Sequence, residues 1–276
     1  MNTETAKARA EELIRHESAA YRDKCEPFFS YLEKKQGEWN GAQFKAFREF
    51  FLYHAWFSEI AVGKILSAAY RHLDFDAVHA VSRHARAFAG ADYANAAILN
   101  STISTLNRHG ELVFKVAPCA MDFQPKSFHG NSDMEKFVAA QSWCFDNLNY
   151  RIALGAYYAQ CFAPSQELEK FFNSFLAPYT ECYAGVADFH LVEVCFIQKS
   201  TVLGDYCRDT LWPVVPKHCF NQKNLNDVVM GVRLLLKAQS DLWLGLHQKL
   251  VSWGGPSGAS GNPPQPTISP EKILQN

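Results

Sequence analysis

Prolines are almost absent from the first 117 residues, where Pro27 is the only one. A proline inside a helix removes a backbone hydrogen bond and clashes with the preceding turn, so long proline-free stretches can be helical throughout. The apolar residues of this region recur at helical spacing and do not alternate with polar ones, as they would in a half-buried strand. Nearly all of it is therefore predicted to be helical.

The rest of the chain divides into helical segments at its glycines and prolines. Helical spacing of apolar residues covers residues 13–21, 44–70, 75–88, 93–116, 134–162, 166–176, 186–211 and 225–253. No segment alternates for long enough to indicate a strand. The expected fold class is all-α, with about eight helices in a single bundle.

The composition changes at Gly254. The last 23 residues hold four of the 15 glycines and five of the 12 prolines. Such a segment cannot bury enough apolar surface to order itself. We therefore expect one helical domain over residues 1–253 and a disordered tail over residues 254–276.

Charge and composition narrow the class of partner. The formal net charge is −1, so nothing in the overall charge favours nucleic acid or an anionic membrane. Aromatic residues make up 14% of the chain, which favours an apolar core with a small-molecule pocket. The first 24 residues lack the apolar run of a secretory signal, and the eight cysteines do not form metal-binding motifs. We expect a soluble, cytoplasmic protein with reduced, buried cysteines and no nucleic-acid or membrane partner.

Two stretches are similar to one known group of helical proteins. Residues 26–28 read Glu-Pro-Phe where that group commonly has His-Pro-Phe, Gly37 follows about ten positions later, and residues 44–57 are rich in aromatic rings. Residues 238–243 are similar to the last helix of the same proteins. On these residues the chain resembles the heme-oxygenase-like superfamily, which includes TenA-type thiaminases, the PQQ-synthesis protein C and di-iron oxidases of natural-product pathways. The resemblance implies a helical bundle around a small-molecule pocket.

The di-iron branch of the superfamily uses about six metal ligands, and most of them have no counterpart in this chain. Two of the corresponding positions keep a ligand type, His109 and Glu193, whereas the others fall on Thr102, Gln160 or Cys161, Ile197 and Ser200. The resemblance therefore implies no complete di-iron site.

A smaller iron site is still compatible with the sequence. His190 and Glu193 are three residues apart on one expected helix face, and His109 is expected on a facing helix. Two histidines and one carboxylate, with open positions for O2 and substrate, are the ligand set of mononuclear Fe(II) oxygenases. These three residues are the predicted metal ligands, with Fe(II) as the cofactor. In the alternative, His190 makes a polar contact in the core, Glu193 pairs with a lysine, and there is no cofactor.

A metal-free enzyme of the TenA type needs a nucleophilic cysteine. The resemblance places that residue at Cys161, with Tyr157, Tyr158 and Gln160 as neighbouring substrate-binding candidates. Other TenA acids correspond to His54 and to Gln239 or Asp241, so thiamin salvage itself is not expected.

The aromatic helix holds a third candidate site. His54 and Glu59 would form a His–carboxylate pair suited to acid–base catalysis. Tyr53, Trp56 and Phe57 are expected in the adjacent pocket wall. The alternative is a buried polar pair whose hydrogen bonds are satisfied within the core.

These observations lead to two functional hypotheses. The first is an iron-dependent oxidase or oxygenase that modifies an aromatic or amphipathic natural product. The second is a metal-free enzyme similar to TenA or to the PQQ-synthesis protein C, or a ligand-binding protein, which uses His54, Glu59 and Cys161. A homodimer and a purely structural role are left open by the sequence.

Overall fold

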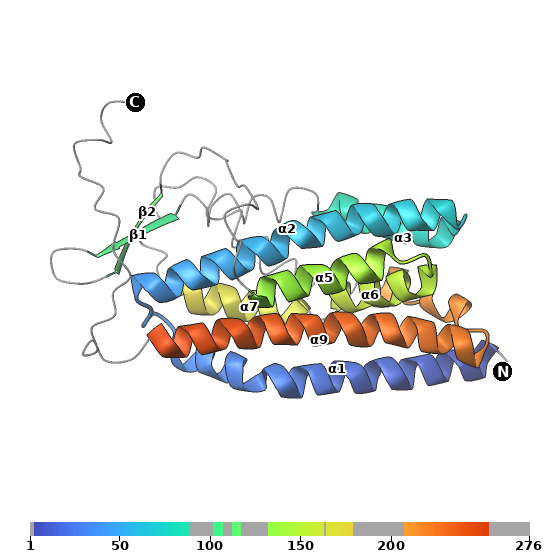
Figure 1. Cartoon of the computed structure of the whole chain (residues 1–276), viewed down its shortest axis with the longest axis horizontal. Helices are drawn as coiled ribbons and strands as arrows, with labels where there is room; N and C mark the ends of the chain where they lie inside the picture. Colours follow the sequence, from blue (N-terminus) through green and yellow to red (C-terminus); the bar gives the residue numbers. More distant parts are fainter. Residues whose placement is uncertain are drawn as a thin grey trace, which may run out of the picture.

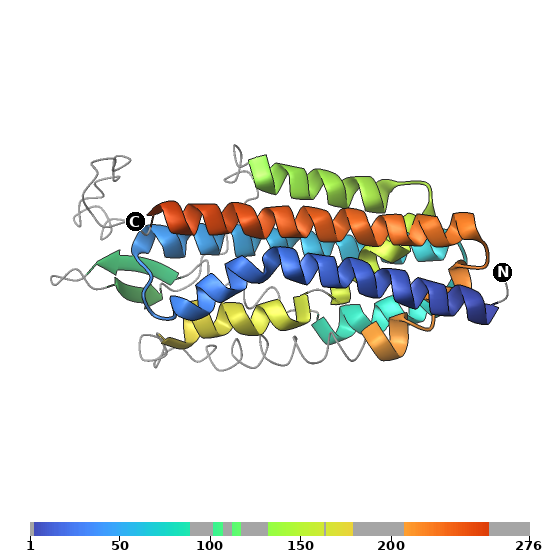
Figure 2. The same ribbon diagram turned by 90° about the horizontal axis from the view of Figure 1, so that it is seen from below.

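The computed structural model describes residues 3–88, 102–106, 112–116, 132–162, 164–178 and 207–253. Within these ranges the long helices run side by side along one axis, which confirms the all-α class and a bundle of about eight helices (Figures 1 and 2). The α-helices are α1 (Thr3–Lys34), α2 (Gly41–Arg71), α3 (Phe75–Phe88), α5 (Ser132–Asp146), α6 (Tyr150–Phe162), α7 (Pro164–Phe171) and α9 (Gln222–Trp253). Shorter segments are the π-helical turns η2 (Phe172–Leu176) and η4 (Cys207–Leu211) and the 3₁₀ turn η5 (Val215–His218). None of the helices in these ranges could span a membrane.

Two short strands replace part of a predicted helix. β1 (Thr102–Leu106) pairs antiparallel with β2 (Leu112–Val116), with Thr102 opposite Val116 and Leu106 opposite Leu112. The helix predicted over residues 93–116 is therefore wrong in these two segments. Both are rich in β-branched residues, whose side chains favour an extended backbone.

Pro27 lies inside α1. From the sequence we expect it at the start of a helix, where its missing N–H costs nothing, and that expectation is wrong. Figure 2 shows that α1 bends along its length, as expected where a proline removes one backbone hydrogen bond. The sequence also favours a helix break at Gly37, and α1 does end just before it, at Lys34. The φ of Gly37 is +74°, in the left-handed region that glycine adopts at little cost.

The helix predicted over residues 134–162 is divided into α5 and α6. The side chain of Asn147 accepts a hydrogen bond from the backbone N–H of Asn149 at 2.8 Å, which forms a turn between them. By contrast, α3 has the predicted bounds, and α2 and α9 extend the predicted segments by a few residues.

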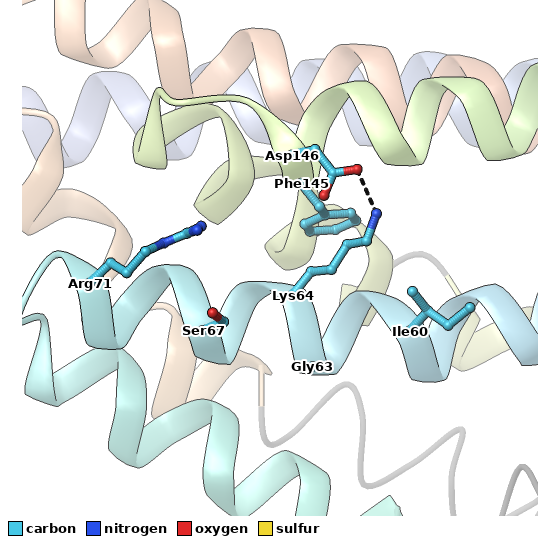
Figure 3. Close-up of a pocket in the computed structure, with 7 residues that line it drawn as sticks. All are labelled: Ile60, Gly63, Lys64, Ser67, Arg71, Phe145 and Asp146. Atoms are coloured by element: carbon cyan, nitrogen blue, oxygen red, sulfur yellow. Dashed lines mark hydrogen bonds and ion pairs between the residues drawn. The ribbon is translucent and has the colours of Figure 1, made fainter.

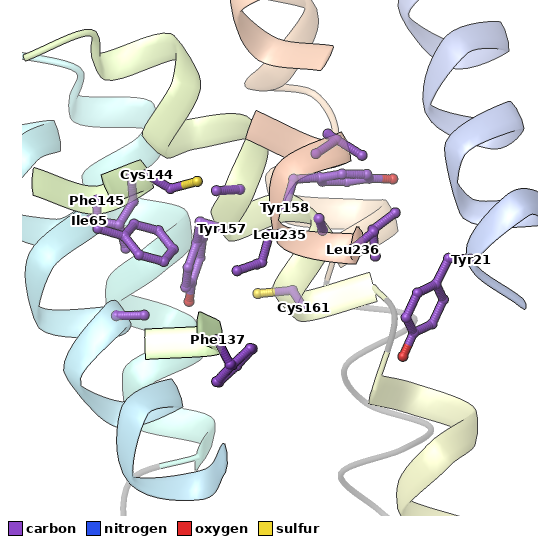
Figure 4. Packing of buried hydrophobic residues seen from close by; sticks show 14 of the residues in the cluster. Tyr21, Ile65, Phe137, Cys144, Phe145, Tyr157, Tyr158, Cys161, Leu235 and Leu236 are labelled. Carbon is purple, nitrogen blue, oxygen red and sulfur yellow. The ribbon is translucent and has the colours of Figure 1, made fainter. Parts of the chain in front are cut away.

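The last helix, α9, packs against α1, α2, α5 and α6. Its closest neighbour is α6, because the two helices cross at Gly155 and Gly231, where neither has a side chain to separate the backbones. Figure 4 shows the packed interior near this crossing, with Leu235 and Leu236 of α9 close to α6. The core is thus built around α9.

Candidate functional site

A buried carboxyl group lies between α1, α7 and α9. Glu167 of α7 is only 3% exposed, and three side chains donate hydrogen bonds to it. The hydroxyl of Tyr21 donates to Oε1. Gln239 Nε2 and Trp243 Nε1 both donate to Oε2, each at 3.1 Å. These four residues are called the Glu167 cluster below.

Local sequence explains how the helices position this cluster. Gln239 and Trp243 are four residues apart on α9, so their side chains share one face. Pro164 is the first residue of α7, a position where a missing N–H costs nothing, and Glu167 follows within the first turn. Phe171 lies one turn further along α7, and its ring centroid is 5.0 Å from that of Trp243. The carboxyl group is therefore enclosed by aromatic rings.

Burial raises the pKa of Glu167 to about 8, even though the hydrogen bonds from Gln239 and Trp243 act in the opposite direction. The carboxyl group is therefore mainly neutral at pH 7. Indole N–H groups only donate hydrogen bonds, so Oε2 acts as an acceptor and the acidic proton lies at Oε1. The contact described above, in which the Tyr21 hydroxyl donates to Oε1, is that of the ionised group. When Oε1 carries the proton, Glu167 donates to the Tyr21 oxygen instead. The pair can thus exchange the direction of one hydrogen bond.

Gln239 has a buried oxygen that its neighbours do not satisfy. The residue is 0% exposed, and its Oε1 has no hydrogen-bond partner among the described residues. Reversing the amide would leave the NH2 group in the same position, so one end of the amide is unpartnered in either orientation. Unpaired buried polar atoms are rare in folded proteins because they lose hydration without compensation. One polar atom of the cluster is therefore left without a hydrogen bond among the described residues.

The predicted site residues on α6 are all buried, but their side chains do not face one common pocket. They are Tyr157, Tyr158, Gln160 and Cys161. Figure 4 shows Tyr157 and Tyr158 pointing to different sides of α6, with Tyr157 on the side of Phe145 and Ile65. Tyr158 packs on Trp212 at 5.3 Å between centroids. Gln160 accepts a hydrogen bond from Gln141 at 3.2 Å.

Cys161 is buried and forms no disulfide bond, and the same holds for Cys25, Cys144 and Cys219. Burial raises the pKa of Cys25 and Cys144 to about 12 and that of Cys219 to about 11. These three thiols are protonated at neutral pH and unsuited to nucleophilic attack.

The remaining predicted site residues cannot be compared with this geometry. The backbone of α2 carries Tyr53, His54, Trp56, Phe57 and Glu59, but their side chains lie outside the described residues. The predicted metal ligands His109, His190 and Glu193 lie outside the described residues with both backbone and side chain. In the described part of the chain, no three His, Cys, Asp or Glu residues are grouped to hold a metal ion. The predictions for these residues stay predictions.

Sequence reasoning missed Glu167 and Tyr21. The sequence Pro-Ser-Gln-Glu at residues 164–167 is typical of a solvated helix start, and Tyr21 is one apolar position among several on α1. Gln239 and Trp243 fall within the stretch that resembles the last helix of the superfamily. That resemblance is the one sequence signal that drew attention to any residue of the Glu167 cluster.

A second polar cluster joins three turns at one end of the bundle. Asp74 Oδ2 accepts hydrogen bonds from the Tyr150 hydroxyl at 2.8 Å and from His218 Nε2 at 2.7 Å. Asp74 Oδ1 accepts one from the backbone N–H of Ala77, which caps α3. Burial alone would raise the pKa of Asp74, but the hydrogen bonds from His218, Ala77 and Tyr150 hold it at about 2. This aspartate stabilises the fold as an anion.

Asp74→Asn is expected to lower the free energy of unfolding by about 2 kcal/mol near neutral pH, because the lost anion is stabilised in the folded state. The carboxyl pKa is 3.8 ordinarily and about 2 in the fold, so its contribution is present above 3.8 and is lost as the pH falls toward 2. Urea titrations over this range measure the difference between the two proteins. It should shrink with acidification, whereas Asp146→Asn, which removes an exposed partner of Lys64, should change stability little. A pH-independent difference would contradict the prediction.

A surface groove of about 330 Å³ lies between α2 and the end of α5. Figure 3 shows Lys64, Ser67 and Arg71 of α2 along it, with Asp146 paired to Lys64 at 2.6 Å. The groove is open to solvent and shares no residue with the Glu167 cluster.

No family model matches this chain, and no curated protein or solved structure is significantly similar to it.

Proposed function

We propose that the protein is a small-molecule enzyme in which Glu167 is the general acid–base. The observation that supports this most strongly is the convergence of Tyr21, Gln239 and Trp243 on one enclosed carboxyl group. A carboxylic acid kept neutral at pH 7 by its surroundings can donate a proton to a substrate and later take it back. Tyr21 faces the oxygen that carries this proton and can stabilise either state.

The surroundings of the acid favour an aromatic or amphipathic substrate. The rings of Phe28 and Phe171 both pack against Trp243. Gln239 Oε1 adds one hydrogen-bond acceptor beside these apolar surfaces. A flat ring that carries an N–H or O–H group would match both features.

Entry of a substrate requires one wall of the cluster to move, and we assign this role to α7. It has 8 residues, fewer than any other α-helix in the described ranges, and the π-helical turn η2 follows it directly. Helices of this length depend on packing for their stability, and π-helical turns are frequent at functional sites. A small shift of α7 would open the carboxyl group to solvent.

Membership of the heme-oxygenase-like superfamily is part of the same proposal. The all-α bundle and the sequence pattern at residues 26–57 and 238–243 support it. The Glu167 cluster favours the metal-free branch, in which protein side chains move the proton. Cys161, His54 and Glu59 are the further catalytic candidates within that branch.

The test is to incubate the purified protein with a low-molecular-mass cell extract and follow the loss of individual compounds by mass spectrometry. Wild type should consume one or a few aromatic or amphipathic compounds, and Glu167→Gln should slow that reaction by about 100-fold or more. Glu169→Gln, an exposed change on the same helix, should react like wild type. An extract left unchanged by wild type, or equal rates for the two variants, would contradict the proposal.

The iron-dependent oxidase is a second proposal, supported by the resemblance and by the ligand types at His109, His190 and Glu193. Anaerobic loading with Fe(II) followed by metal analysis should then give about one iron per chain. His109→Ala and His190→Ala should each lower the bound iron strongly. No bound iron, or binding indifferent to both changes, would rule out this version.

A further inference from the structure

Three turns that lie far apart in the sequence meet at one end of the bundle. They are the turn between α2 and α3, the turn between α5 and α6, and the turn that precedes α9 (Figure 1). Asp74 joins them through its hydrogen bonds to Tyr150 and His218. The positions of the three turns are therefore fixed relative to one another.

Each of these turns presents a large apolar side chain to solvent. Leu148 is 95% exposed, Leu73 is 72% exposed, Phe75 is 66% exposed and Phe220 is 54% exposed. Each of the four is one or two residues from Asp74, Tyr150 or His218. Side chains this exposed project from the surface and do not line a groove. Several large apolar residues gathered at one site indicate an interaction surface.

The backbone at Leu73 is strained, and the fold gains no packing from the residue. Leu73 has φ of +53°, in the left-handed region, where the N–H groups of Leu73 and Asp74 bond to the carbonyls of Tyr70 and Ala69. This helix ending usually has glycine at the left-handed position. Leucine is unfavourable at this position for two reasons. Its Cβ atom disfavours the left-handed backbone, and its apolar side chain is exposed to water. Such outliers are a reason to look for a function.

Two cations near the apolar residues could attract an anionic surface. Three acids in or beside these turns are paired: Asp76 with Lys217, Asp146 with Lys64, and Asp74 with His218. Arg71 and Lys223 are exposed and have no ion-pair partner among the described residues. They are therefore available to bind external anions. A second copy of this chain would bring the same cations together and is disfavoured for that reason.

The groove of Figure 3 adjoins this surface. Arg71 lines the groove and is two residues from Leu73, and Asp146 at its other side is two residues from Leu148. Ser67 and Arg71 are one turn apart on α2, so a hydroxyl and a guanidinium group face the same space. A phosphate group is the anion that such donors recognise well.

We propose that this end of the bundle binds the surface of an anionic phospholipid membrane. Leu73, Phe75, Leu148 and Phe220 insert shallowly among the acyl chains, and a lipid phosphate lies in the groove against Ser67 and Arg71. Interfacial binding of this kind combines buried apolar side chains with attraction of Lys and Arg to anionic lipids. The surface shares no residue with the Glu167 cluster, so it can be tested separately from the proposed catalysis.

Co-sedimentation of the full chain with vesicles tests the proposal. Vesicles of phosphatidylcholine and phosphatidylserine should bind the protein, and vesicles of phosphatidylcholine alone should bind it much less. Leu148→Ser and Phe220→Ser should each weaken binding by about tenfold, because each removes a side chain that would be buried in the bilayer. Arg71→Gln should weaken it by about fivefold. Sodium phosphate should release no more protein than sodium chloride of the same ionic strength.

Leu73→Gly separates binding from folding. It removes an inserted side chain and also relieves the backbone, so vesicle binding should fall by about tenfold while the melting temperature stays equal or rises. Val251→Ser is the matched control, since Val251 is 51% exposed near the other end of α9. It should bind like wild type. Three results would overturn the proposal: no binding to anionic vesicles, equal binding by all variants, or a homodimer that Leu148→Ser dissociates.

Discussion

Gly155→Ala and Gly231→Ala are each expected to lower the free energy of unfolding by about 3 kcal/mol or more. A Cβ atom at Gly155 would lie 2.0 Å from the carbonyl oxygen of Val228. A Cβ atom at Gly231 would lie 2.0 Å from the carbonyl oxygen of Ile152. Both obstacles are backbone atoms in the middle of helices, so they can move only if α6 and α9 separate. Separation would loosen the most extensive helix pair of the core.

Gly63→Ala is the control for this prediction. Gly63 is also inside a helix, but a Cβ atom there would meet nothing within 4 Å. The variant should be more stable than wild type by up to about 1 kcal/mol, because alanine favours the helix. Urea unfolding followed by circular dichroism measures all three variants. The explanation fails if alanine at Gly155 or Gly231 is as well tolerated as at Gly63.

Sequence periodicity predicted the long helices well and their contacts poorly. The bounds of α3 and most of α2 and α9 follow from apolar residues spaced at helical intervals, a property of each segment alone. The α6–α9 crossing depends on two glycines 76 positions apart, and neither interrupts the helical pattern around it. The strands β1 and β2 were missed because apolar residues in short segments fit a helical spacing as readily as an extended one.

The candidate site was harder to predict for the same reason. Tyr21 and Glu167 are 146 positions apart, and Gln239 is 72 positions beyond Glu167. A single sequence does not say which helices are neighbours, so an acid at the start of α7 is read as a solvated residue. Its unusual pKa arises entirely from tertiary burial.

Whole-chain charge does not describe how charge is distributed over the surface. A net charge of −1 gave no reason to expect an anionic partner. The distribution differs locally, because three acids at the end of the bundle are paired while Arg71 and Lys223 remain available. The proposed membrane binding depends on this local arrangement and not on the net charge.

Glu167→Gln is expected to remove the pH dependence that this residue gives to the stability of the fold. The carboxyl pKa is 4.5 ordinarily and about 8 in the folded protein. Below pH 4.5 the carboxyl group is protonated in both the folded and the unfolded state, so it does not lower the free energy of unfolding. Between 4.5 and 8 the unfolded chain releases the proton and the folded chain keeps it, so the free energy of unfolding falls as the pH rises. Above 8 the loss is complete and amounts to several kcal/mol.

Glutamine is the right replacement because it reproduces the neutral acid. Its oxygen can accept from Gln239 and Trp243, and its NH2 group can donate to Tyr21, as the proton on Oε1 does. The variant should therefore match wild type near pH 4.5 and exceed it by several kcal/mol at pH 8 and above. Urea titrations between these limits measure the difference. Glu169→Gln, exposed on the same helix, should keep the wild-type slope, and the same slope in Glu167→Gln would mean that Glu167 is ionised in the folded protein.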